Sequence, residues 1–226
     1  MWNAGSGFMA IWSDVAPDDR DFYHDWLLKE HFAERVGIPG FIAARVFRRA
    51  VGPDLQFFIL YETESPEVLA SPAYVVRLNN PTEKSRTVMP KLKNFARGAG
   101  RVVQSSGVCG GGAAKVMRFG SPHALLGDKT ARNALFKTIN AMDRVLAVRL
   151  FEVDTAATTI QTEEKKMRTS KEEIYSQLLV IEAVDLAALD AVSEALKGAL
   201  FGEDSGGRPF DQSYQFIAEL QGRSLA

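Results

Sequence analysis

The alternation of apolar and polar positions in the first half of the chain predicts elements in the order β-α-β-β-α-β. An apolar run from Phe8 to Trp12 precedes a long helical pattern, and Val-Gly-Pro-Asp then separates two β-rich runs that we expect to form a hairpin. The expected elements are a strand at 8–12, a helix from about Arg20 to Val36, strands at 41–50 and 55–64, a helix from Ser65-Pro66 to about Leu78, an irregular basic segment from Asn79 to Arg97, and a strand at 100–108.

The second half repeats this order with a weaker pattern. "ARVF" at Arg45 corresponds to "VRLF" at Arg149, and "FILYE" ending at Glu62 corresponds to "LLVIE" ending at Glu182. The offset is 149 − 45 = 104 residues for the first match and 182 − 62 = 120 for the second, so the second hairpin loop is longer by 16 residues. The expected elements are strands at 113–119, 146–154, 175–185 and 214–220 and helices at 130–143 and 186–201.

The longer loop corresponds to a charged insertion, Thr158–Glu173. With few apolar anchors, it is expected to extend the hairpin or form a mobile loop outside the core, so that its deletion would change stability little. The glycines at 107–112 lead into a strand rather than a helix, which favours a linker over a phosphate-binding loop. We therefore expect a unit at 1–106 that carries any site, a linker at 107–112, and a mainly structural unit at 113–226.

Both faces of the run at 55–64 are apolar at its middle, since Phe57 and Ile59 point one way and Phe58 and Leu60 the other. The two helices of a β-α-β-β-α-β unit cover only one face of its sheet, so the other face needs a second sheet. This predicts an α+β fold in which two tandem ferredoxin-like units pack their antiparallel sheets face to face.

Composition narrows the class of protein without naming its activity. The 226 residues are 46% hydrophobic, with 27 basic and 28 acidic residues and a net charge of −1, which favours a globular protein and gives no footprint for nucleic acid. The first residues contain no basic leader or long apolar run, so we expect no secretory signal, no membrane span and a cytoplasmic location. The one cysteine, Cys109, lies among glycines and is interpreted as structural or incidental.

The first helix and the turn after it contain Trp26, Glu30-His31, Glu34-Arg35 and Pro39-Gly40-Phe41. This pattern resembles the EthD-like branch of the dimeric α/β-barrel superfamily, and the layout resembles two such units fused in one chain. The superfamily includes isomerases, lyases, antibiotic-biosynthesis monooxygenases, chlorite dismutases and dye-decolourising peroxidases. The resemblance therefore implies a fold more than a reaction, and it leaves open whether the chain forms a homodimer.

On an ideal α-helix, His24 and His31 are separated by about 10.5 Å of rise and about 20° of rotation. They cannot share one metal ion, and because no other cluster completes a ligand set, we predict no metal. The helical wheel puts both histidines on a stripe with Arg20 and Arg35, roughly opposite a second stripe. That second stripe contains Phe22, Trp26 and Ala33. The sequence does not decide which stripe faces the sheet.

His31 is the favoured catalytic residue, because the resemblance retains it and because imidazole titrates near neutrality. His24 is its weaker neighbour, and for both the alternative is an ordinary packed histidine. Arg45 is a candidate for binding a carboxylate or phenolate, with a cross-strand pair to Glu62 as the alternative. Aromatic side chains would line an apolar pocket or simply pack the core. The expected substrate-binding residues are Trp12, Tyr23, Trp26, Arg45, Tyr61 and Tyr74.

The leading functional hypothesis is a cofactor-independent enzyme that acts on a small, apolar, aromatic substrate by His-mediated proton transfer, as an isomerase or lyase. A non-catalytic binding protein would use the same pocket. A cofactor-free oxygenase also stays open. In the peroxidase-like relatives that the resemblance includes, a haem is held by a histidine of the C-terminal unit, and here only His123, in the loop "GSPHALLG", could take that place.

Overall fold

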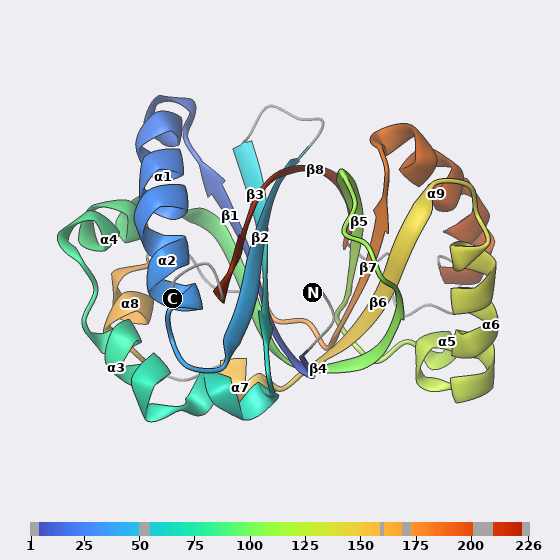
Figure 1. Cartoon of the computed structure of the whole chain (residues 1–226), viewed down its shortest axis with the longest axis horizontal. Helices are drawn as coiled ribbons and strands as arrows, with labels where there is room; N and C mark the ends of the chain where they lie inside the picture. The colour runs from blue at the N-terminus through green and yellow to red at the C-terminus, as the bar shows by residue number, and fades with distance from the viewer. Residues whose placement is uncertain (1–4, 50–54, 159–160, 169–172, 201–209, 223–226) are drawn as a thin grey trace.

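The computed structural model describes residues 5–49, 55–158, 161–168, 173–200 and 210–222. Within these ranges the strands form a closed antiparallel barrel in the order β1-β3-β2-β8-β5-β7-β6-β4 (Figure 1). The strands are β1 Gly7–Val15, β2 Phe41–Arg49, β3 Leu55–Thr63, β4 Lys93–Gly107, β5 Ala113–Phe119, β6 Val145–Val153, β7 Gln177–Ala183 and β8 Phe210–Gln221. Each half contributes the same order, β4-β1-β3-β2 and β8-β5-β7-β6, which is that of a ferredoxin-like sheet.

The two four-stranded sheets join at both edges. β2 pairs with β8, where Arg45 lies opposite Glu219, and β4 pairs with β6, where Arg101 lies opposite Glu152. The inner faces do meet across a shared core of aromatic and aliphatic side chains, but the edges also hydrogen-bond, so the sequence-based picture of two stacked sheets was incomplete. Closure removes the free strand edges that separate sheets would leave. The boundaries of the two predicted units, and their origin as a tandem, stay predictions.

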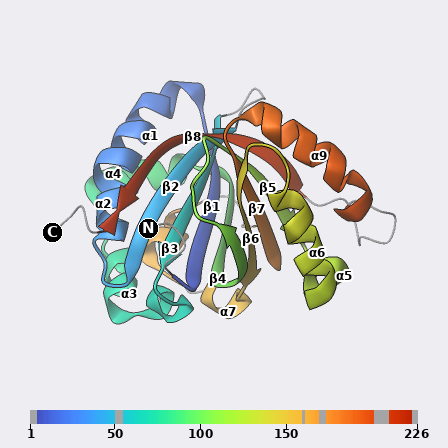
Figure 2. The same ribbon diagram turned by 45° about the vertical axis from the view of Figure 1, so that its right-hand side comes forward.

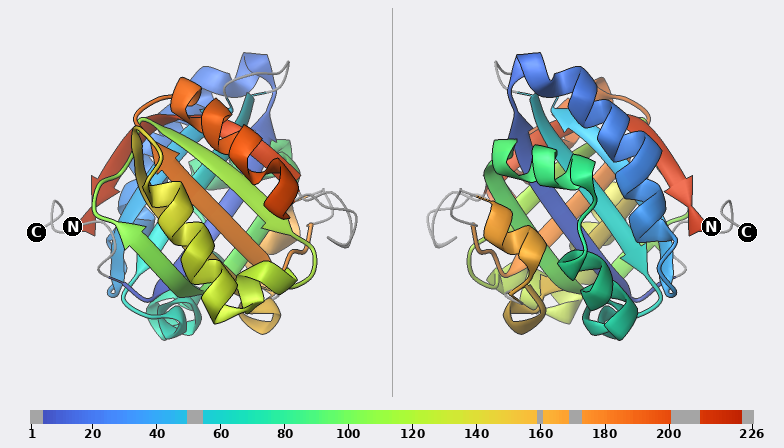
Figure 3. Two further views of the ribbon diagram at one scale, coloured as in Figure 1. Left: turned by 90° about the vertical axis from the view of Figure 1, so that its right-hand side faces the viewer. Right: turned by 90° about the vertical axis from the view of Figure 1, so that its left-hand side faces the viewer.

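Helices cover the outside of the barrel (Figure 1). Those of the first half lie over one side, together with α8, and α5, α6 and α9 lie over the other (Figure 3). The helical segments are η1 Pro17–Asp19, α1 Arg20–Trp26, η2 Leu27–His31, α2 Phe32–Val36, η3 Pro66–Ala70, α3 Pro72–Asn79, α4 Glu83–Val88, η4 Met89–Lys91, α5 Ala124–Gly127, α6 Lys129–Asn140, α7 Thr155–Thr158, α8 Glu163–Met167 and α9 Leu186–Leu200. None of these helices combines the length and hydropathy that a membrane span requires.

The predicted helix at 20–36 forms, but it is not a uniform α-helix. Its middle, η2, is a π-helical turn that separates α1 from α2. The prediction of an irregular segment at Asn79–Arg97 was wrong, because this segment contains α4, η4 and the start of β4. Thr82 caps α4 by accepting a hydrogen bond from the backbone N–H of Ser85 at 3.1 Å. A six-residue helix has too few turns to give a clear apolar period.

The insertion differs most from expectation. Its described part contains the end of α7 and all of α8, and Thr158, Thr162 and Glu164 are buried. Figure 2 shows α7 below the barrel, and Figure 3 shows α8 against the first-half helices. The prediction of a solvated loop was therefore wrong for this part, while residues 159–160 and 169–172 lie outside the described residues. The insertion of the second half packs on the helical layer of the first.

Candidate functional site

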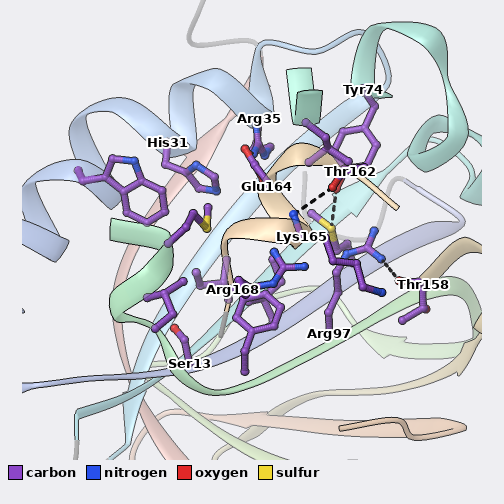
Figure 4. Close-up of a pocket in the computed structure, with 18 of the residues that line it drawn as sticks. Ser13, His31, Arg35, Tyr74, Arg97, Thr158, Thr162, Glu164, Lys165 and Arg168 are labelled. Atoms are coloured by element: carbon purple, nitrogen blue, oxygen red, sulfur yellow. Dashed lines mark hydrogen bonds and ion pairs between the residues drawn. The ribbon is translucent and has the colours of Figure 1, made fainter. Parts of the chain in front are cut away.

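A cavity lies between the outer face of the first-half sheet and the helices that cover it (Figure 4). Its empty space is about 710 Å³ when the open solvent at its mouth is included. Side chains from β1, β3 and β4 form its floor, including Met9, Ile11, Ile59 and Phe95. Its polar lining residues are Ser13, His31, Arg35, Arg97, Thr158, Thr162, Glu164, Lys165 and Arg168.

The π-helical turn sets which side chains of the first helix face this cavity. Trp26 and His31 are five residues apart, so an α-helix would place them about 140° apart around its axis. The turn η2 runs between them, and hydrogen bonds from residue i to i+5 bring such positions onto one face. Their ring centroids are 4.3 Å apart, and both side chains line the cavity. The two stripes of the helical wheel are thus not opposite one another.

His31 is 5% exposed, and among the described residues its buried Nδ1 has no hydrogen-bond partner. The Oε2 of Glu34 is 3.9 Å from Nδ1, too far for a hydrogen bond, and the other oxygen of that carboxylate pairs with Arg77. Burial lowers the pKa of His31 well below 6.5, and the charges of Arg35 and Arg77 lower it further. The imidazole is therefore neutral at neutral pH and can accept a proton.

Arg35 lies one helical turn beyond His31 and is 2% exposed. Its Nη2 donates to Oε1 of Glu164 on α8, so a carboxylate from the insertion neutralises this buried guanidinium. Its Nη1 is buried with no hydrogen-bond partner among the described residues. Arg35 lines the cavity, and one of its strong donors has no acceptor among the described residues.

Three further cations line the cavity. Arg97 on β4 donates from Nη1 to the backbone oxygen of Thr158 at 2.9 Å, and the guanidinium of Arg168 lies over the ring of Phe95, 4.1 Å from its centroid. Lys165 comes from α8. Figure 4 shows Arg97 and Lys165 on the side of the drawn pocket away from His31, with Arg168 nearer its middle. The cavity wall therefore carries both cationic side chains and a neutral imidazole.

The aromatic lining is fixed by its own hydrogen bonds. Trp26 donates from Nε1 to the hydroxyl of Ser85 at 3.0 Å, and the hydroxyls of Tyr23 and Ser13 are 3.3 Å apart. Burial raises the pKa of Tyr23, so its phenol stays protonated. The hydroxyl of Tyr74 contacts the sulfur of Met9 at 3.1 Å. These contacts fix the orientation of the rings, which give the cavity an apolar aromatic surface.

Four residues expected in the site lie outside this cavity. His24 is half-buried with its ring edge-on to Phe57, at 5.2 Å between centroids, because the π-helical turn begins after it. Trp12 points into the barrel, where it stacks on Phe58 at 4.9 Å. Tyr61 packs in the first-half core beside the cavity. The fourth, Arg45, belongs to a separate charged cluster.

That cluster lies where β2 of the first half pairs with β8 of the second. Arg45 and Arg149 both donate to the carboxylate of Glu182, and the Nε of Arg45 is 3.1 Å from Oε2 of Glu219. A smaller cavity, of about 330 Å³, is lined by Arg149 and Glu62 among others. The residues matched by the internal repeat, Arg45 with Arg149 and Glu62 with Glu182, thus meet around one buried network.

Sequence reasoning placed His31, Tyr23, Trp26 and Tyr74 in the site, and all four line the cavity. It missed the polar lining from β4 and from the insertion. The signal that could have found part of it is "TEEKKMR" at 162–168, where a threonine cap precedes a short charged helix. The cavity is therefore not confined to the first half, as the sequence led us to expect.

The described residues contain no group of three or more His, Cys, Asp or Glu that could hold a metal ion. His123 precedes α5, with its ring 5.4 Å from that of Phe119. The space between α6, α9 and the second-half sheet is filled by an apolar cluster that includes Phe136, Leu179 and Val192. The residues around His123 therefore do not fit a haem.

No protein-family model and no curated protein matches the sequence. Solved structures do match its fold. A candidate monooxygenase from Fusobacterium nucleatum aligns with a TM-score of 0.61 and 9% identity, over 98% of this chain and 96% of that one. An anthrone oxidase-like protein aligns at 0.60 and 11%, over 98% and 94%. A chlorite dismutase from Candidatus Nitrospira defluvii aligns at 0.55 and 10%, over 97% and 93%. The chain thus has the ferredoxin-like α/β-barrel fold.

Proposed function

We propose that this protein is an enzyme that removes a proton from a small, flat, largely aromatic molecule, with His31 as the general base. One observation carries the proposal. A buried, neutral imidazole without a hydrogen-bond partner on Nδ1 lines an enclosed cavity whose other walls are aromatic and cationic. Buried nitrogens of His24 and His123 also lack partners among the described residues, so the place of His31 in the cavity wall is what sets it apart.

The proton removed must be an acidic one. An imidazole whose pKa lies well below 6.5 is a weak base, so it suits a C–H beside an aromatic carbonyl or a phenolic O–H. As the substrate loses that proton it gains negative charge, and this charge stabilises the new imidazolium of His31. Return of the proton to a different carbon completes an isomerisation, and return to a leaving group completes an elimination.

A second candidate is cofactor-free oxygenation. The solved structures with similar folds include an anthrone oxidase-like protein and a candidate monooxygenase, and these names favour enzymes that act on small molecules. An enolate formed by His31 could react with dioxygen instead of being reprotonated. The two candidates share the first step and differ in oxygen uptake. A binding protein remains the alternative without chemistry, and homodimer formation stays a prediction.

The test measures the shared step directly. We expect the protein to catalyse exchange of the acidic C–H of an aromatic ketone with deuterium from solvent, followed by NMR over a panel that includes anthrone and carboxylate-bearing ketones, with oxygen uptake recorded in parallel. His31→Gln should reduce exchange about 10²–10⁴-fold while the protein stays folded. His123→Gln is the matched control, because that ring lies against Phe119 outside the cavity, and it should be nearly silent. Full activity in the His31 variant would contradict the proposal.

A further inference from the structure

We propose that Glu34 is a positioning residue for His31. Its carboxylate holds the imidazole proton on Nδ1, which leaves the lone pair of Nε2 as the base. Arg77 holds the other oxygen of that carboxylate. This role rests on the proposed function, in which His31 accepts the substrate proton, and it assigns the ring nitrogen that does so.

The two ring nitrogens of His31 lie in different surroundings. Nδ1 is buried without a hydrogen-bond partner among the described residues. Nε2 is not buried in this way, although His31 forms no hydrogen bond with any described residue. Because the side chain lines the cavity and is 5% exposed, Nε2 is the nitrogen that a bound molecule can reach (Figure 4).

The carboxylate of Glu34 lies on the Nδ1 side of the ring. Glu34 follows His31 by three residues, and its Oε2 is 3.9 Å from Nδ1. A neutral imidazole has one N–H, and its other nitrogen presents a lone pair. A lone pair on Nδ1 would be repelled by the carboxylate, whereas an N–H at that position is attracted to it. The local charge therefore favours the proton on Nδ1.

The contact gains strength as the proton is transferred. The C–H or O–H bond of the substrate breaks with its electron pair left on the substrate, an Nε2–H bond forms, and the Nδ1 proton stays in place. The imidazolium attracts the carboxylate of Glu34 more strongly than the neutral ring does. Catalytic hydrogen bonds are often long before the substrate is bound and shorten in the complex, so 3.9 Å between Nδ1 and Oε2 suits this role.

Arg77 on α3 fixes the carboxylate. Its Nη2 pairs with Oε1 of Glu34, while Oε2 is the oxygen nearer to His31. The pairing also offsets the negative charge of Glu34. Burial lowers the pKa of His31, and the charges of Arg35 and Arg77 lower it further, so the imidazole stays neutral and able to accept a proton. Arg77 thus both orients Glu34 and tunes the base.

The other charged groups around His31 do not compete for its Nδ1 proton. Arg35 is a cation and pairs with Glu164 of α8. Glu30 precedes His31, but its Oε1 accepts from the hydroxyl of Thr82. The remaining charged side chains in the described cavity lining are cations, which cannot accept a proton: Arg97, Lys165 and Arg168. Glu34 is therefore the carboxylate that faces Nδ1 among the described residues.

NMR observes the tautomer directly and needs no substrate. The chain has three histidines, so long-range proton–nitrogen correlation spectra of the labelled protein contain three imidazole patterns. The pattern that His31→Gln removes belongs to His31. At neutral pH we expect its proton on Nδ1. A proton on Nε2, or an even mixture of the two tautomers, would overturn the assignment.

Charge variants test Glu34 and Arg77 in opposite directions. Glu34→Gln should release the tautomer, lower the titration midpoint of His31 and reduce deuterium exchange about 10–100-fold, the usual cost of losing an orienting partner. The Arg77 side chain is 32% exposed, so this variant leaves no deeply buried unpaired charge and should stay folded. Arg77→Met should raise the midpoint, because it removes a positive charge near the ring.

Glu30→Gln is the matched control. Glu30 is adjacent to His31 on the same helix but bonds to Thr82, so this variant should change neither the tautomer nor the midpoint. Equal effects of Glu30→Gln and Glu34→Gln would overturn the role of Glu34, and so would midpoint shifts in the same direction for Glu34→Gln and Arg77→Met.

The NMR readouts separate this role from the proposed function, because they do not depend on turnover. If His31→Gln keeps full exchange activity while His31 holds its proton on Nδ1 in the wild type, the proposed base is wrong and Glu34 still sets the tautomer. If His31→Gln loses exchange activity while the wild-type proton lies on Nε2, the base stands and the role of Glu34 is wrong.

Discussion

Arg35 on α2 donates a hydrogen bond to Glu164 on α8, across 129 residues of sequence and from one half of the chain to the other. Both side chains are buried, at 2% and 4% exposure. The N–H of Glu163 also donates to Oδ1 of Asn79 on α3 at 3.1 Å. These contacts hold the insertion of the second half against the helices of the first, and Arg35 and Glu164 both line the cavity.

Glu164→Gln should lower the free energy of unfolding by about 3–5 kcal/mol, because it leaves the buried guanidinium of Arg35 without its counter-ion. Urea unfolding measures this change. The double variant Arg35→Met, Glu164→Met should lose less than the single one, since two apolar side chains remove the unpaired charge. A cost below about 1 kcal/mol for Glu164→Gln would mean that α8 separates freely from α2.

The junctions between the halves offer a matched comparison of two carboxylates. Glu182 is 0% exposed and accepts from both Arg45 and Arg149, whereas Glu152 pairs with Arg101 across β4 and β6 with both side chains exposed. Glu182→Gln should cost about 3–5 kcal/mol and Glu152→Gln at most about 1 kcal/mol in chemical denaturation. Similar costs for the two would contradict a structural role for the buried network.

His31 should make the folded protein less stable in mild acid. The unfolded chain binds a proton on this imidazole near pH 6.5, while burial and the charges of Arg35 and Arg77 keep the folded pKa well below that value, with Glu34 already paired to Arg77. The stabilisation is therefore fully present above about pH 6.5 and is lost as the pH falls toward the folded pKa.

The measurement is the difference in unfolding free energy between the wild type and His31→Gln as a function of pH. Below pH 6.5 the wild type should lose stability relative to His31→Gln, by at most about 1.4 kcal/mol for each pH unit. Carboxylates protonate in both proteins and cancel in the difference. A difference that does not change between pH 7 and 5 would show that the imidazole titrates normally.

Much of the fold follows from local pattern. The apolar alternation predicted the order of strands and helices along both halves, and the doubly apolar run at 55–64 correctly implied a second sheet against the inner face. Edge pairing was not visible, because hydrogen bonds between β2 and β8 or β4 and β6 join segments far apart in sequence. No side-chain pattern specifies that two sheets close into a barrel rather than stack.

The site was only partly predictable for a different reason. The helical wheel assumed 3.6 residues per turn throughout Arg20–Val36. One π-helical turn was enough to bring Trp26 beside His31 and to move His31 off the helix face that His24 occupies. The lining from Thr162 to Arg168 was missed because its charges have no apolar period. The burial of Glu164 depends on Arg35, a partner on the other half of the chain.

The pH dependence of catalysis tests the base itself. The acidic limb of the kcat/KM profile reports the free enzyme. Its midpoint should lie below pH 6.5, because burial and the neighbouring arginines lower the pKa of His31. The limb of kcat reports the complex, and a bound substrate that carries negative charge would favour the imidazolium and raise that pKa. We therefore expect the kcat limb at higher pH than the kcat/KM limb. His31→Gln should abolish both, measured as deuterium exchange between pH 4.5 and 8, and limbs that persist unchanged in this variant would assign the base to another group.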